Sequence, residues 1–116
     1  VQSNLTILES DVNAKLEDDI SNFNKKSLDI KDIIVKVGDD ILNFEKKFIC
    51  FKIDVEGHEI HTLKGLINNL KNNKCLVLIE IFDFNFHKVN EFFKSLNYKQ
   101  TYYFKNTSYY VFSNIN

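Results

Sequence analysis

Three acidic residues stand where two apolar segments of the chain end. Asp54 and Glu56 follow the first segment, and Glu80 lies near the end of the second. Side chains two residues apart on extended backbone point to the same side, so Asp54 and Glu56 are expected to leave the chain together. Gly57 comes next and allows a sharp turn or the close approach of a ligand to the backbone.

Carboxylates in such a cluster suit three kinds of chemistry. They can accept hydrogen bonds from the hydroxyl groups of a substrate, take a proton from a nucleophile, or hold a hard divalent cation through oxygen ligands. The structural alternative is that Asp54 and Glu56 cap the helix that follows, where an acid gains roughly 0.3 to 1 kcal/mol from the helix dipole. These residues alone leave all four roles open.

Two strands and the helix between them must position the acids. Residues 48–55 are nearly continuous in β-branched and aromatic residues, which is typical of a parallel strand covered on both faces. Apolar residues at spacings of three and four then predict a helix over 60–70. Residues 75–82 predict a second buried strand. Ligands collect at the carboxyl ends of parallel strands, so Asp54 and Glu80 are expected to meet at that edge.

The C-terminal part of the chain continues this pattern. Apolar spacing predicts a helix over 86–96, and residues 98–104 and 109–113 predict an antiparallel hairpin. Its aromatic residues, like those of the preceding helix, are expected in the core. The resulting order over 48–113 is strand, helix, strand, helix, strand, strand, which indicates βαβ units followed by one antiparallel strand.

Residues 1–47 are poorly defined by their pattern. Residues 5–8 could form a short strand, and residues 12–23 are acidic and rich in asparagine with weak helical spacing. Residues 30–37 read as an extended segment, and 39–44 as a short helix. The whole chain, 1–116, fits a single small domain.

Lys52 and Glu80 are charged residues inside apolar segments. An acid in so apolar a run is rarely left unpaired. A lysine in the same setting is expected to run along the sheet to a carboxylate. We therefore expect Lys52 to be buried and Glu80 either to pair with it or to belong to the site.

The histidines and cysteines give weaker signals. His58 and His61 are three residues apart, whereas the zinc-protease motif requires four and a third ligand is not in view, so no metal site is predicted. His58 lies next to the strand edge and is a candidate for lining a pocket, while His61 is expected to face solvent. Cys50 and Cys75 are predicted to be buried thiols.

The string at 51–59, F-K-I-D-V-E-G-H-E, resembles the late motif of the FkbM family of methyltransferases, K-I-D-x-E-G-x-E. In that family an L-x-G element and a strand ending in an acid follow. They are matched here by 63–65, L-K-G, and 78–81, L-I-E-I. Residues 35–42 are also similar to the stretch before the motif, so the similarity runs from about 33 to 113.

The resemblance implies an α/β fold with a Rossmann-like methyltransferase sheet, mainly parallel and ending in an antiparallel hairpin. It implies methyl transfer from S-adenosylmethionine to a hydroxyl of a sugar or natural product. The residues that match the family motif are Lys52, Asp54, Glu56, Gly57, Glu59, Gly65 and Glu80. We expect Asp54 and Glu56 to be catalytic, with one of them as general base. The expected site-lining residues are Lys52, Gly57, His58, Glu59 and Glu80.

One departure from the family is the loop D-x-G-A-x-x-G, which binds the cofactor there. This chain has 3 glycines, Gly38, Gly57 and Gly65, and none lies in such a loop. We therefore expect the chain to bind S-adenosylmethionine weakly or not at all by itself and to be the C-terminal part of a longer methyltransferase domain. The strand at 48–55 would then have an unpaired edge, through which two copies could dimerise. The alternative is a non-catalytic α/β interaction module derived from this fold.

Composition and charge exclude other classes of function. The formal net charge is -1 with lysines and acids spread along the chain, so no basic face for nucleic acid is expected. The apolar segments are strand-sized, far short of the ~20 residues of a membrane span. No phosphate-binding loop accompanies the acids, which argues against a Mg²⁺-dependent phosphoryl enzyme. The unpaired cysteines favour a cytoplasmic setting.

Overall fold

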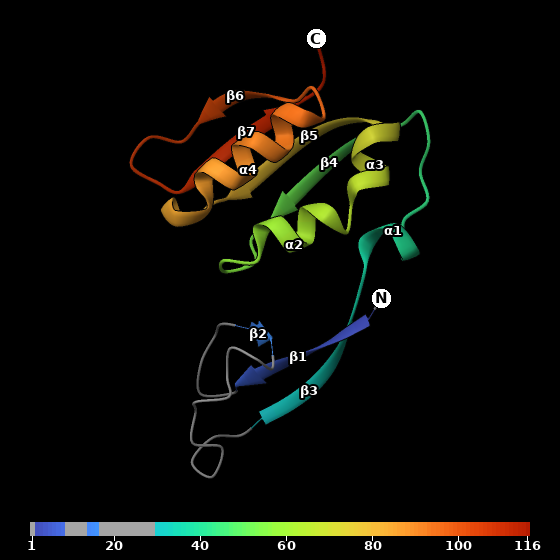
Figure 1. The fold of residues 1–116 in the computed structure, drawn as a ribbon, viewed down its shortest axis with the longest axis vertical. Helices are drawn as coiled ribbons and strands as arrows, with labels where there is room; N and C mark the ends of the chain where they lie inside the picture. Colours follow the sequence, from blue (N-terminus) through green and yellow to red (C-terminus); the bar gives the residue numbers. More distant parts are fainter. Residues whose placement is uncertain (1, 9–13, 17–29) are drawn as a thin grey trace. The chain divides into compact units, whose positions relative to one another are not determined.

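The computed structural model describes residues 2–8, 14–16 and 30–116, which belong to two compact units, 1–37 and 38–116 (Figure 1). The first unit contains β1 (Gln2–Leu8), β2 (Ala14–Leu16) and β3 (Ile30–Lys36), joined in an antiparallel sheet of order β2-β1-β3. The predicted strand at 5–8 and the extended segment at 30–37 are thus confirmed. In the predicted weak helix over 12–23, residues 14–16 form β2 and the rest lies outside the described residues.

The second unit is a four-stranded sheet packed against helices. Its elements are α1 (Gly38–Ile41), β4 (Phe48–Ile53), α2 (Glu59–Lys64), α3 (Ile67–Asn72), β5 (Lys74–Glu80), α4 (Asp83–Ser95), β6 (Lys99–Tyr103) and β7 (Tyr109–Ser113). The sheet order is β4-β5-β7-β6. The predicted α/β fold is confirmed. Each segment from 48 to 113 that was predicted as a strand is a strand, and each predicted helical segment is helical.

The sheet is mixed, and the prediction of a mainly parallel sheet is wrong for the described strands. β4 and β5 are parallel, whereas β7 is antiparallel to both β5 and β6. The reason is the final hairpin. After α4 the chain forms β6 at the edge of the sheet, and the turn that follows brings β7 back between β6 and β5 (Figure 1).

The single helix predicted over 60–70 is two short helices, α2 and α3, with Gly65 and Leu66 between them. The carboxylate of Asp39 accepts hydrogen bonds from the backbone N–H groups of Asn68 (2.9 Å) and Asn69 (3.1 Å), so α1 supplies the N-terminal cap that α3 lacks. The Asp39 N–H donates to the carbonyl of Gly65 (2.7 Å). A Cβ atom at Gly38 would lie too close to the end of the Leu66 side chain, which would have to shift to make room.

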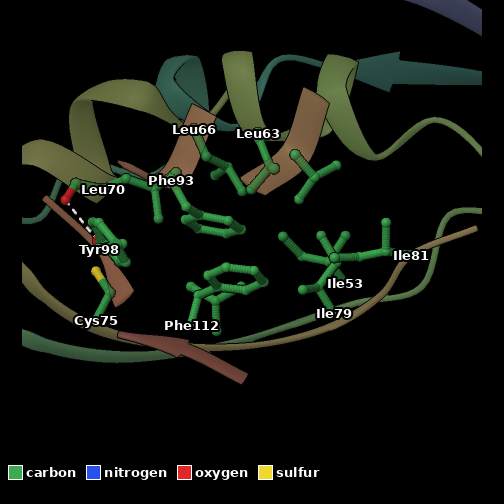
Figure 2. Close-up of a cluster of buried hydrophobic side chains, with 12 residues drawn as sticks. Ile53, Leu63, Leu66, Leu70, Cys75, Ile79, Ile81, Phe93, Tyr98 and Phe112 are labelled. Carbon is green, nitrogen blue, oxygen red and sulfur yellow. Dashed lines mark hydrogen bonds between the residues drawn. The ribbon is translucent and has the colours of Figure 1, made fainter. Parts of the chain in front are cut away.

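The core lies between the sheet and helices α2, α3 and α4 (Figure 2). Phe93 of α4 stacks on Phe112 of β7, with ring centroids 4.2 Å apart. The buried Tyr98 hydroxyl donates to the carbonyl of Leu70 in α3 (2.7 Å) (Figure 2). Burial raises the pKa of both Tyr98 and the Cys75 thiol. The core residues are Ile53, Leu63, Leu66, Leu70, Cys75, Val77, Ile79, Ile81, Val89, Phe93, Tyr98 and Phe112.

The opposite face of this sheet carries no helix in the described part of the chain, which corrects the prediction that β4 is covered on both faces. Phe48 is 80% exposed, and Cys50 and Lys52, which follow it on the same face, are exposed as well. The predicted burial of Cys50 and Lys52 is therefore wrong, whereas Cys75, on the helix side of β5, is buried as predicted.

The aromatic residues of the hairpin divide between core and surface. Tyr98 and Phe112 are buried, as predicted for the group, but Tyr102 and Tyr103 on β6 are exposed because β6 is the outer strand. Within the ranges that the structure describes, no helix has the length and apolar character needed to cross a membrane.

Candidate active site at the carboxyl edge of the sheet

The register of the strands brings three polar side chains into one row. Ile53 of β4 lies beside Ile79 of β5, so Asp54, one residue further, comes beside Glu80. Glu80 in turn pairs with Tyr109 of β7. The row stands at the carboxyl ends of β4 and β5, so the predicted meeting of Asp54 and Glu80 at this edge is confirmed.

The turn after β4 adds a third acid to this row. Glu56 and Gly57 have φ angles of 52° and 98°, and the His58 N–H donates to the Val55 carbonyl (3.2 Å). Two successive positive φ angles closed by such a bond are those of a type I′ turn. Asp54, Glu56 and Glu80 each offer a carboxylate oxygen, and these oxygens lie within 4.8 Å of one another.

Gly57 is required in this turn for its backbone conformation. A Cβ atom at this position would lie 3.8 Å from Phe82 and Phe84, which is an ordinary contact distance. The φ of 98° is what disfavours a side chain. The role expected for Gly57 from the sequence, a sharp turn, agrees with this geometry.

Tyr109 is a residue of this edge that the sequence reasoning missed. Its hydroxyl donates to Asp54 Oδ2 (2.9 Å). This hydrogen bond, followed by desolvation and the nearby Glu80, raises the pKa of Tyr109 to about 12. Tyr109 is therefore a protonated donor at neutral pH that orients Asp54. The only sequence signal was its place as the first residue of β7, which becomes informative once the antiparallel register to β5 is known.

Glu59 lies beneath the turn and not at its surface. Its side chain is fully buried, and Oε1 and Oε2 accept hydrogen bonds from the Gly57 N–H (3.3 Å) and from Asn85 Nδ2 (2.6 Å). Glu59 was predicted to line the site, but its side chain is buried beneath the turn and does not reach the surface of the site. Asn85, which the sequence analysis did not single out, is its partner from α4.

His58 and Lys52 are placed differently from the acids. His58 precedes α2 and is partly buried, with its ring centroid 6.0 Å from that of His61. His61 is exposed, as expected, whereas the role of His58 in lining a pocket stays a prediction. Lys52 lies two residues before Asp54, on the helix-free face, and is beside Leu78. Among the described residues no ion pair joins Lys52 to Glu80, so that predicted pair is absent. In the parallel register Lys52 lies beside Leu78, two positions before Glu80.

The arrangement can bind hydroxyl groups, accept a proton or hold a hard cation. Three carboxylates at this spacing offer oxygen ligands of the kind that Mg²⁺ and Ca²⁺ prefer. This group of three carboxylates contains no histidine or cysteine, the residues that most often bind zinc. The expectation that the site holds no metal stays a prediction.

Comparison with known proteins gives one match. The family model described as the methyltransferase FkbM domain matches residues 6–100, which is most of the chain and includes all three acids. The match begins earlier than the similarity read from the motifs. No curated protein matches this sequence, and no solved structure matches it either.

Proposed function

Because this chain belongs to the FkbM methyltransferase domain family, we propose that it forms the acceptor side of an S-adenosylmethionine-dependent methyltransferase with a Rossmann-like sheet. The methyl acceptor in this proposal is a hydroxyl group of a sugar or another hydroxylated natural product. The observation that supports it is the row of Asp54, Glu80 and Tyr109, joined by Glu56, at the edge of the sheet where ligands of such folds bind.

Asp54 is the proposed general base. Its Oδ2 accepts the hydrogen bond of Tyr109, so the carboxylate is held in one orientation in which Oδ1 can accept a hydrogen bond from the acceptor hydroxyl. S-adenosylmethionine would supply the methyl group as a sulfonium. As the new O–CH₃ bond forms and the S–CH₃ bond breaks, the hydroxyl proton passes to Asp54.

Glu56 and Glu80 are proposed to hold the acceptor. Their oxygens lie within 4.8 Å of each other and of Asp54, a spacing that suits neighbouring hydroxyl groups on one molecule. Positioning of this kind can supply a large part of the rate of a bimolecular transfer. The proposal thus assigns one acid to proton transfer and two to orientation.

Cofactor binding by this chain alone is expected to be weak or absent. Gly38 and Gly65 take part in the contact between α1 and the α2–α3 junction, and Gly57 is in the turn at the acceptor edge. None of the 3 glycines is therefore available for a loop that holds the methionine end of the cofactor.

The test is methyl transfer by the full-length protein from S-adenosylmethionine labelled in its methyl group to a panel of sugars and hydroxylated natural products. Asp54→Asn should abolish transfer with little loss of stability, because the side chain is exposed and the amide still accepts from Tyr109. Glu91→Gln, which changes an exposed acid on α4 that pairs with Lys94, is the control and should transfer at the wild-type rate. Wild-type rates for Asp54→Asn would refute the assignment.

A second candidate function is a non-catalytic α/β interaction module. The helix-free face of the sheet, with Phe48 80% exposed and Leu76 40% exposed, favours it. Calorimetry with S-adenosylmethionine, on this chain and on the full-length protein, separates the two. Binding by the full-length protein supports the methyltransferase, and no binding by either supports the module.

A further inference from the structure

A polar pair, the fully buried Glu59 and the partly buried Asn85, lies directly under the Glu56–Gly57 turn. Glu59 is the first residue of α2 and Asn85 is in the first turn of α4. Glu59 accepts hydrogen bonds from the Gly57 N–H (3.3 Å) and from Asn85 Nδ2 (2.6 Å). Asn85 Nδ2 also donates to the Gly57 carbonyl (2.9 Å). Both backbone polar groups of Gly57 are thus held by one pair of side chains, which we term the Glu59–Asn85 clamp.

The clamp holds a turn that is unfavourable by itself. Glu56 has a positive φ, a conformation that costs most residues free energy and persists only where surrounding contacts enforce it. Burying a carboxyl group is also costly unless its oxygens are hydrogen-bonded. Here the two costs are coupled, because the buried Glu59 is satisfied by the same Gly57 whose conformation it fixes.

We propose that Glu59 and Asn85 are positioning residues, which keep the Glu56 carboxylate beside Asp54 and Glu80 by holding the turn in its left-handed form. The consequence for methyl transfer rests on the proposed function, whereas the consequence for the turn does not. The motif resemblance placed Glu59 among the residues that line the site; the hydrogen bonds give it a different task and add Asn85, which lies outside the motif. Neither residue is required to touch the acceptor.

The experiment uses Glu59→Gln and Asn85→Ala in the full-length protein. A glutamine oxygen can accept only one of the two donors that Glu59 now serves, and its amide group then faces the other. Asn73→Ala is the matched control, because Asn73 is a buried amide that donates to the carbonyls of Phe44 and Asn69, far from the turn in the fold. The double variant Glu59→Gln/Asn85→Asp exchanges donor and acceptor and restores the bond between α2 and α4, whereas the Gly57 carbonyl loses the donor that Asn85 supplies.

Two readouts separate positioning from stability. The first is amide hydrogen exchange at Gly57 relative to a core amide such as that of Ile79; it should rise roughly tenfold or more in both clamp variants. The second is the methyl-transfer rate, where kcat should fall about 100-fold with an unchanged KM for S-adenosylmethionine, since the loss is in acceptor geometry. Asn73→Ala should lose stability without either change, and the reversed pair should recover part of kcat.

Clamp variants that lose stability as the control does, without faster exchange at Gly57 or lower kcat, would overturn the proposal. If the wild-type protein transfers no methyl group to any acceptor, the proposed function fails. Exchange at Gly57 then still decides whether the clamp holds the turn, so the two failures are distinguishable.

Discussion

At the scale of single residues, Glu56 has a backbone conformation that non-glycine residues rarely adopt. Its φ of 52° costs about 1 to 2 kcal/mol relative to the right-handed region. Strain of this kind concentrates at functional sites, where surrounding contacts maintain it. In this chain it places a third carboxylate next to Asp54 and Glu80, which repel it as like charges. The conformation works against stability and in favour of the proposed site.

Glu56→Gly should therefore raise the stability of the protein and lower its methyl-transfer activity. Glycine adopts the same φ without strain, and after the greater entropy of its unfolded chain is subtracted we expect a gain of about 0.5 to 1 kcal/mol in the free energy of unfolding, measured by urea denaturation. Methyl transfer should fall at least about tenfold. Glu56→Gln, which keeps the strain and removes the charge, should lose activity with less gain in stability. A less stable glycine variant would contradict this account.

The bond between Tyr109 and Asp54 should be visible in a tyrosine titration. The pKa of Tyr109 is raised to about 12, chiefly by donation to Asp54. Because the pKa is raised, the hydrogen bond contributes its full stability at pH values below the ordinary tyrosine pKa of about 10. This contribution is lost as the pH rises through about 12.

Asp54→Asn removes the charge, so the pKa of Tyr109 should return toward its ordinary value. NMR of tyrosine labelled with ¹³C at Cζ measures this, with Tyr109→Phe to assign the signal. A Tyr109 pKa at its ordinary value of about 10 in the wild-type protein would mean that the hydrogen bond is absent in solution.

At the scale of elements, α2 and α3 are separate helices because a residue far along the chain caps the second one. Asp39 accepts from two N–H groups at the start of α3 and from Asn69 Nδ2 (2.7 Å). Asn69 is buried and donates with the same Nδ2 to the Leu42 carbonyl (2.9 Å), which ties the segment after α1 to α3. This network fixes the segment that leads into β4.

Asp39→Ala should destabilise the protein by roughly 2 kcal/mol. About 1 kcal/mol comes from the lost cap, and the remainder from the buried Asn69 groups left without their acceptor. The measurement is the free energy of unfolding from urea denaturation followed by circular dichroism. Glu45→Ala, an exposed acid in the same segment, is the control and should change stability by less than about 0.5 kcal/mol. Equal effects of the two variants would show that the cap is not formed.

At the scale of the whole molecule, the described core and the proposed site belong to one unit. Every residue of the described core lies between 53 and 112, and the acids, Tyr109 and the Glu59–Asn85 clamp lie in the same range. The unit of residues 38–116 therefore holds the contacts that position its own site.

Residues 38–116 should consequently fold without residues 1–37. A protein of that range should unfold in a cooperative thermal transition and keep the raised pKa of Tyr109. Circular dichroism and the tyrosine titration described above are the measurements. A non-cooperative transition would mean that the first unit is needed to complete the core, and the variant Phe93→Ala, which should lose about 3 to 5 kcal/mol, gives the reference for a disrupted core.

Much of the second unit follows from local pattern. The runs at 48–55 and 75–82 predict strands because β-branched and aromatic residues fit a pleated, packed surface, and the motif at 51–59 with the L-x-G and L-I-E-I elements identifies the family. The same local order brings Asp54 and Glu80 to one edge, because the carboxyl ends of parallel neighbours coincide.

Other features depend on contacts between residues distant in the chain, and only the tertiary structure decided them. Strand order put β7 beside β5, which made the sheet mixed and delivered Tyr109 to Asp54. The helix-free face left Lys52 exposed, since a strand pattern does not record how many faces are covered. The burial of Glu59 depends on Asn85 from another helix. Sequence determined which chemical groups this edge could offer, and packing determined which of them act at its surface and which support it from below.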